Sequence, residues 1–133
     1  MVGAGLALSP DGPPRPCAKA LVGAGTLAGT LGDYPAARGF LQNALKLAVG
    51  DPVTTTRALT RLGMVAMFAD DISGARALQE RSLALCREIQ DLRWQALTLF
   101  LLGLARMLLG DLDRAEATLT ESLDLCRTVG NGA

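Results

Sequence analysis

Apolar positions along the chain recur at the three- and four-residue spacing of amphipathic helices, and Gly, Asp and Pro interrupt them at regular intervals. The clearest case is the stretch 94–130, in which Gly110 and Asp111 separate two helical patterns. A Gly that ends one helix and an Asp that caps the next are typical of a tight turn between paired helices. The pattern predicts six helices, at about residues 17–31, 34–49, 53–69, 73–89, 92–109 and 112–129.

The predicted helices form a repeat. The glycine at position 103 aligns with those at 63 and 25, so the steps are 40 and 38 residues, within the range of helical solenoids. Three helix pairs follow from this register, at about residues 17–52, 53–91 and 92–130, each stacked on the next. The equivalent positions are Gly25, Gly63 and Gly103; Asp33, Asp71 and Asp111; and Ala37, Ala75 and Ala115.

With a Gly late in each first helix and an Ala early in each second helix, the chain resembles tetratricopeptide-like repeats over about residues 17–130. The resemblance implies an all-α fold, a right-handed solenoid of antiparallel helix pairs with three repeats. Leu21, Leu59 and Leu99 stand where that family usually has Trp. The step also exceeds the usual value of about 34 residues. In this it resembles the arrays inside large bacterial regulatory ATPases of the LuxR type and the maltose-activator type, whose ATPase and DNA-binding parts match nothing here.

Residues 1–16 are predicted to lie outside the array. The segment Leu6–Leu8 precedes Leu45–Leu47 by 39 residues, so it can be the remainder of a preceding second helix; a disordered leader is the alternative. Residues 9–16 contain four prolines and are predicted to be a linker. At the other end, residues 130–133 resemble the turn into another repeat. We therefore expect a longer array, or a partner that covers this end.

Composition narrows the function. Half of the residues are hydrophobic but only 4% are aromatic, which favours a helical core. Thirteen basic and thirteen acidic side chains cancel, so the chain lacks the positive charge expected of a nucleic-acid binder. The absence of His removes an imidazole base and any His-bearing metal site. We predict no enzymatic activity, no cofactor and no direct contact with nucleic acid.

The sequence also predicts a cytoplasmic protein. Its most apolar run, 96–109, is too short to cross a bilayer and contains Arg106, so it is predicted to be a buried helix. The first residues lack the basic and apolar regions of a secretory signal. The three cysteines show no C-x-x-C spacing, which favours reduced thiols in a reducing compartment.

One stretch matches a cofactor motif. Residues 21–28 fit the G-x-G-x-x-A pattern of dinucleotide-binding loops. That loop requires a preceding strand and an acidic residue about 20 positions further on. No strand-like run precedes the stretch, Asp51 follows Gly25 by 26 residues, and the repeat register explains Gly25 independently. We therefore interpret it as part of a helix.

In tetratricopeptide-like arrays the inner face of the first helices lines a concave groove that takes the ligand. The resemblance therefore implies a partner-binding groove, which becomes more apolar towards the C-terminus. Methionines suit such an adaptable surface. The alternative is that these side chains are buried core. The candidate groove residues are Arg57, Thr60, Met64, Met67, Phe68, Leu97, Phe100, Leu104, Met107 and Leu108, preceded in the first repeat by Lys19, Val22, Thr26 and Thr30.

The sequence thus predicts a non-catalytic interaction scaffold or sensor module, a fragment of a larger bacterial transcriptional regulator. Its groove would bind a segment of a partner protein or a neighbouring domain. The groove and the ends of the array are also candidate sites of self-association. A small-molecule effector sensor is the alternative that the resemblance implies, although the residues suited to a sugar pocket (Trp94, Tyr34, Thr60 and Arg57) are scattered. A structural spacer would carry polar residues in place of Met and Phe.

Overall fold

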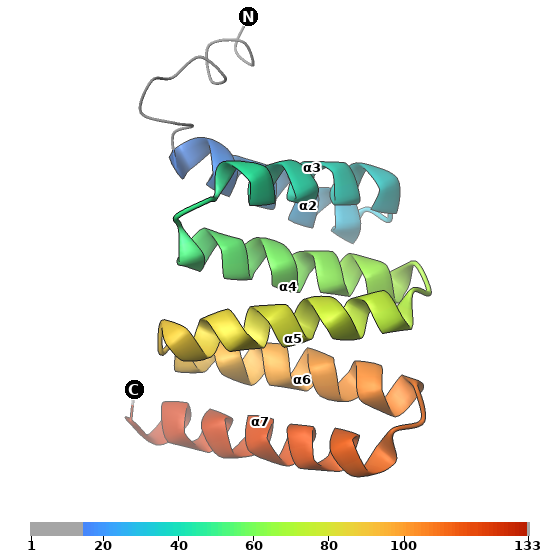
Figure 1. The fold of residues 1–133 in the computed structure, drawn as a ribbon, viewed down its shortest axis with the longest axis vertical. Helices are drawn as coiled ribbons and strands as arrows, with labels where there is room; N and C mark the ends of the chain where they lie inside the picture. Colours follow the sequence, from blue (N-terminus) through green and yellow to red (C-terminus); the bar gives the residue numbers. More distant parts are fainter. Residues whose placement is uncertain (1–14, 133) are drawn as a thin grey trace, which may run out of the picture.

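A computed structural model of the chain describes residues 15–132, which form six helices joined by short turns (Figure 1). The helices are α2 (Arg15–Thr30), α3 (Tyr34–Leu47), α4 (Pro52–Phe68), α5 (Ile72–Glu88), α6 (Leu92–Leu108) and α7 (Leu112–Gly132). The preceding helix predicted near the N-terminus lies outside the described residues. The predicted linker extends too far, because Pro16 already belongs to the first turn of α2. Proline is compatible with that position because the first turn needs no backbone N–H.

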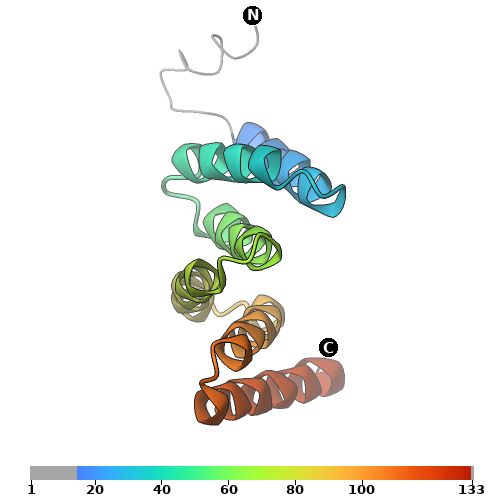
Figure 2. The same ribbon diagram turned by 90° about the vertical axis from the view of Figure 1, so that its right-hand side faces the viewer.

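Consecutive helices pair antiparallel, α2 with α3, α4 with α5 and α6 with α7, and the pairs stack along the long axis of the molecule (Figures 1 and 2). Helix α4 packs against both α2 and α3, and α6 packs against both α4 and α5. Each first helix after α2 therefore lies against both helices of the preceding pair. No strand occurs among residues 15–132. This is the predicted all-α solenoid of three helix pairs.

The turns within the pairs follow the predicted chemistry. Gly32 and Gly110 have φ angles of 83°, and Asp70 at the equivalent position has a φ of 67°. These are left-handed conformations, which Gly adopts freely and Asp tolerates better than most residues. The next residue caps the following helix: the Asp71 carboxylate accepts a hydrogen bond of 3.0 Å from the backbone N–H of Gly74. The expected Gly–Asp turn and its Asp–Asp variant are both confirmed.

The glycines in register mark close approaches between paired helices. A Cβ atom added to Gly25 would stand 2.5 Å from Cγ of Leu41, well inside van der Waals contact. The other two glycines meet the equivalent side chain of their own pair. The three contacts are Gly25 with Leu41, Gly63 with Gln79, and Gly103 with Leu119. The aligned alanines, Ala37, Ala75 and Ala115, are buried as well. Small residues are therefore required at both aligned positions.

The apolar helix α6 is packed into the array. Leu99 and Leu102 are 2% and 1% exposed and form a core cluster with Leu83 of α5, as expected for a buried helix. Within the part of the chain that the structure describes, no helix has the length and apolarity needed to cross a membrane.

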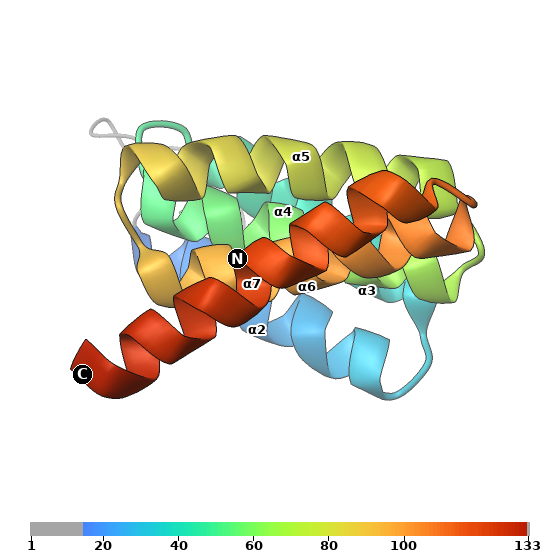
Figure 3. The ribbon, with the colours of Figure 1, turned by 90° about the horizontal axis from the view of Figure 1, so that it is seen from below.

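The predicted turn at the C-terminal end is wrong, because α7 continues as helix to Gly132. The two turns between helix pairs each contain an Asp, Asp51 or Asp91, that caps the next helix. Residues 130–132 are Gly, Asn and Gly, and the helix runs through them although Gly and Asn are common in turns. Seen along the stack, the end of α7 projects beyond the rest of the array (Figure 3).

The cofactor-like stretch 21–28 lies inside α2, with Gly25 in mid-helix and no strand before it among the described residues. A dinucleotide loop requires its glycines in a turn between a strand and a helix. The stretch therefore has the helical role that the repeat register indicates.

Candidate partner-binding surfaces

The ten candidate groove residues do not form one continuous surface. Thr60 lies in the interior and Arg57 lies at a helix junction. Met64 and Phe68 line a cleft between α2 and α4, whereas Leu97 and Phe100 line a groove between α6 and α7. The remaining four are half-buried or exposed side chains at the C-terminal ends of α4 and α6: Met67, Leu104, Met107 and Leu108.

Thr60 is the centre of a buried hydrogen-bond network that joins α4, α5 and α6. Its side chain is 0% exposed, and its hydroxyl lies 2.6 Å from that of Ser82 and 3.0 Å from the indole N–H of Trp94. Ser82 donates its own proton to the carbonyl of Thr56 at 3.1 Å. The Thr60 hydroxyl must therefore donate to Ser82 and accept from Trp94. This residue stabilises the junction of two helix pairs and offers no surface to a partner.

Arg57 supports the same junction. Its guanidinium lies 3.9 Å from the centroid of the Trp94 ring and 2.9 Å from the carboxylate of Asp91, the capping residue of α6. Partial burial alone would raise the pKa of Asp91. The hydrogen bonds from Arg57 and from the backbone N–H of Trp94, with the charges of Arg57 and Arg93, hold that pKa below its usual value. The ion pair joins residues 34 apart in sequence, and no local pattern marks such a contact.

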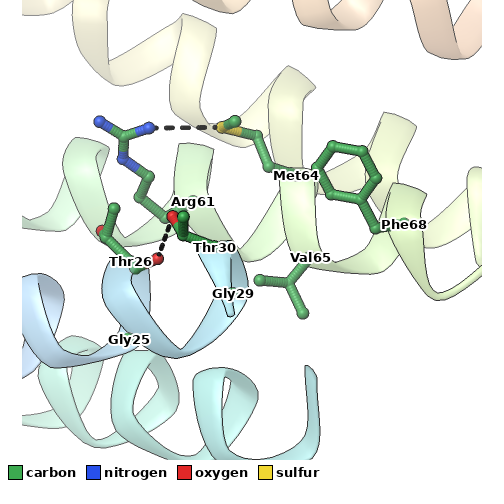
Figure 4. Close-up of a pocket in the computed structure, with 8 residues that line it drawn as sticks. All are labelled: Gly25, Thr26, Gly29, Thr30, Arg61, Met64, Val65 and Phe68. Carbon is green, nitrogen blue, oxygen red and sulfur yellow. Dashed lines mark hydrogen bonds between the residues drawn. The ribbon is translucent and has the colours of Figure 1, made fainter. Parts of the chain in front are cut away.

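The α2–α4 cleft is a small apolar hollow, shown in Figure 4. Gly25 and Gly29 of α2 line one side of it, and Met64, Val65 and Phe68 of α4 form its opposite wall. Its volume is about 90 Å³. Pockets for free small molecules measure about 300–1,000 Å³, so the cleft fits a single apolar side chain.

The two hydroxyl groups of the α2–α4 cleft already have partners. The hydroxyl of Thr26 donates to the carbonyl of Val22 at 2.8 Å, and that of Thr30 donates to the carbonyl of Thr26 at 3.0 Å. Arg61 at the rim donates to the sulfur of Met64 at 3.5 Å. Because both hydroxyls bond within their own helix, the interior of the cleft demands no polar ligand.

Phe68 extends the apolar surface out of the cleft. Its side chain is 64% exposed and stacks on the ring of Tyr34, with centroids 6.2 Å apart and planes inclined by 10°. One repeat later, Leu104 and Leu108 occupy the positions of Met64 and Phe68, and Leu108 is 58% exposed. The C-terminal ends of α4 and α6 therefore both present apolar side chains.

The α6–α7 groove is larger, with a volume of about 590 Å³. Leu97 and Phe100 are two of the predicted groove residues, but their partners on α7 were not predicted. Those partners could have been found from the register, because Leu119 and Leu123 align with Gln79 and Leu83 of α5. The lining residues are Arg93, Ala96, Leu97, Phe100, Leu119, Ser122, Leu123 and Cys126.

A third pocket, lined by α5, α6 and α7, is dominated by paired charges. Arg87 lies 2.8 Å from Glu121, and Arg106 lies 3.3 Å from Glu80 and donates to Thr118 at 2.6 Å. Each carboxylate is paired with a guanidinium, so the pocket has no excess charge to attract an ion. No group of three or more Cys, Asp or Glu residues suited to a metal lies among residues 15–132.

The cysteines differ in environment, which leads to a labelling prediction. Cys86 is fully buried, and burial raises the pKa of its thiol, despite hydrogen bonds from Thr98 and Ser82 that lower it. Cys126 is exposed and Cys17 is half-buried. Because the thiolate is the reactive form, iodoacetamide at neutral pH should modify Cys126 fastest and leave Cys86 unmodified until the protein unfolds. Mass spectrometry of timed samples measures this; early modification of Cys86 would contradict its burial.

A family model described as tetratricopeptide repeat matches residues 54–128, more than half of the chain. The match begins inside α4 and ends inside α7, so it covers the second and third helix pairs. No curated protein matches the chain.

Proposed function

We propose that this chain, which belongs to the tetratricopeptide-repeat family, binds a segment of a partner protein. The segment would lie in the α2–α4 cleft and against the apolar side chains beside it. Tetratricopeptide repeats generally mediate protein–protein interactions and are typically non-catalytic scaffolds. The observation that carries the proposal is the cleft itself, an apolar hollow the size of one side chain beside the exposed ring of Phe68.

A partner segment suits this surface better than a free effector molecule. An apolar side chain of the partner would enter between Gly29 and Met64, and a second would lie against Phe68. A small polar effector would need several free donors and acceptors, whereas Thr26 and Thr30 donate within their own helix. The C-terminal end of α6 also presents apolar side chains, those of Leu104, Met107 and Leu108, and these suit the same class of partner.

We propose that the chain acts as the interaction module of a larger regulator in the cytoplasm. The long repeat step of about 40 residues supports membership of a larger regulator, because it resembles the step in the arrays of large bacterial regulatory ATPases. Three cysteines that are free in the structure are compatible with a reducing compartment.

Selection of peptides tests the proposed surface. Peptides selected from a random phage-displayed library on the immobilised chain should carry an apolar anchor and should bind the soluble chain. Burying one such side chain contributes about 1.5–3 kcal/mol. Met64→Gln, which preserves shape, and Phe68→Ser should therefore each weaken binding by about 10- to 100-fold in a fluorescence titration.

The control is Val49→Ser, because Val49 is 86% exposed and does not line the cleft. Its affinity should match that of the unmodified chain. Peptides that bind all three variants equally would place the binding surface elsewhere, and failure to select any peptide would argue against partner binding.

A further inference from the structure

Both junctions between helix pairs are built in the same way. At the first, the hydroxyl of Thr55 in α4 donates to the carbonyl of Ala48 at 3.2 Å. At the second, the amide of Gln95 in α6 donates to the carbonyl of Cys86 at 3.3 Å. These residues are repeat-equivalent, since Gln95 follows Thr55 by one step and Cys86 follows Ala48 by one step. Each first helix therefore sits in the same register on the pair before it.

The α6–α7 groove repeats the surface on which α6 sits. Five of its residues lie one repeat step after their counterparts on the α4–α5 surface. In order, the counterparts Arg57, Thr60, Gln79, Leu83 and Cys86 become Leu97, Phe100, Leu119, Leu123 and Cys126. No helix among residues 15–132 covers it. Leu123 is consequently 56% exposed, whereas the equivalent Leu83 under α6 is 6% exposed.

At the other end of the array, α2 presents the face that α4 and α6 use for packing. In register, its residues Cys17, Leu21, Ala24 and Leu27 correspond to Thr55, Leu59, Leu62 and Val65 of α4. Val65 is 4% exposed because it packs in the core between α2, α3 and α4, whereas Leu27 is 61% exposed. Among residues 15–132, no helix covers the apolar groove at one end of the array, and none covers the matching apolar helix face at the other.

We propose that a second copy of this chain places its α2 in the α6–α7 groove, so that the solenoid continues from one molecule into the next. This surface is separate from the α2–α4 cleft. The two ends match in size as well as in apolarity. The side chains that line the groove are larger than those on the α4–α5 surface, because Phe100 and Leu119 replace Thr60 and Gln79. The side chains on the packing face of α2 are smaller than those of α6, because Ala20 and Ala24 replace Thr98 and Leu102.

The polar groups fit the same arrangement. The hydroxyl of Ser122 donates to the carbonyl of Ala96 at 2.8 Å and needs no partner from the incoming helix. No buried polar network like that of Thr60 has to be rebuilt, because the groove carries Leu97 and Phe100 where the second pair has Arg57 and Thr60. The net charge of zero gives no general repulsion between copies. The contact is head-to-tail, so it generates open chains of molecules rather than a closed dimer.

The register makes one contact specific. Cys17 occupies the position of Thr55 and Gln95, and Cys126 occupies the position of Ala48 and Cys86. In the proposed assembly Cys17 of one copy therefore lies beside Cys126 of the next. The Thr55 hydroxyl reaches the Ala48 carbonyl, so the two residues are neighbours at this junction. The thiol of Cys86, at the same register position, lies against Thr98, which is one helical turn from Gln95. A disulfide requires Cα atoms within about 7 Å.

Oxidative cross-linking tests the arrangement. Diamide, which accepts the two electrons and two protons of a thiol pair, should convert the full chain into a ladder of disulfide-linked oligomers on a non-reducing gel. Cys17→Ser and Cys126→Ser should each abolish the ladder. An equimolar mixture of the two variants should give a dimer and nothing larger, because each supplies one of the two cysteines. A dimer from Cys17→Ser alone would indicate two grooves facing each other and would overturn the proposal.

Sedimentation without oxidant tests the surface independently. The full chain should associate with rising concentration, and Leu123→Glu should shift it to the monomer. Leu112→Glu is the matched control, because Leu112 lies on the same helix, is 63% exposed and does not line the groove. A chain that stays monomeric would overturn the proposal and favour a different protein as the occupant. Association without the Cys17–Cys126 link would overturn the register.

Discussion

Replacing Gly63 by Leu should lower the free energy of unfolding by about 1–3 kcal/mol through overpacking. A Cβ at this position collides with the side chain of Gln79. Gln79 cannot easily move, because it is 0% exposed and its amide donates to the carbonyl of Thr60 at 3.1 Å. Helix propensity favours Leu over Gly by about 0.8 kcal/mol, which offsets only part of the loss. Ala75→Leu should be destabilising for the same reason, since Ala75 is also 0% exposed.

The matched control is Ala84→Leu, on the same helix as Ala75 but exposed. Its effect should be close to zero, because surface substitutions without a special contact usually change stability by less than about 0.5 kcal/mol. Urea titrations followed by circular dichroism give all three values. Equal losses at the three positions would contradict the close approach between α4 and α5.

The repeat architecture could be predicted from sequence because steric requirements restrict the residue type at fixed intervals. The approach of α2 to α3 leaves so little room at Gly25 that only the smallest residue fits, and the same holds one and two steps later. Left-handed backbone at Gly32 and Asp70 likewise restricts the residue type. Such requirements are local to one position, so they remain visible in a single sequence.

The candidate surface was harder to predict, because exposure depends on which helices come together. Helix α4 packs against α2, α3, α5 and α6, so its buried region is wider than one apolar stripe. Thr60 was therefore predicted to face a groove but lies in the core. The register could not reveal that Trp94 would reach the Thr60 hydroxyl, since neither of the other two repeats has a Trp.

Met64 and Phe68 show the opposite case. Their side chains lie beside a cleft whose other side is lined by Gly25 and Gly29 of α2, and only Gly25 belongs to the aligned set. Gly29 has no equivalent glycine in the second and third repeats, where Met67 and Met107 take its place. The cleft is thus a property of the first junction alone, and the repeat pattern that predicts the fold gives no indication of it.

Replacing Thr60 by Val should lower the free energy of unfolding by about 1–3 kcal/mol, although the two side chains have nearly the same shape. The substitution removes the acceptor of the Trp94 indole N–H and the proton that Thr60 donates to Ser82. The part-buried Trp94 N–H then has no partner in the protein, and such an unsatisfied donor retains part of its desolvation cost. Because Trp94 is the only tryptophan, its fluorescence should shift to longer wavelength as the indole loosens and water gains access.

Thr26→Val is the matched control, because the Thr26 hydroxyl donates only to the carbonyl of Val22 within its own helix. That carbonyl keeps its helical hydrogen bond in the variant, so stability and Trp94 fluorescence should remain nearly unchanged. Guanidinium titrations monitored through the same fluorophore give both quantities in one experiment. If Thr60→Val were as stable as Thr26→Val, the junction between the second and third helix pairs would depend on apolar packing of Leu83, Leu99 and Leu102 rather than on the buried network.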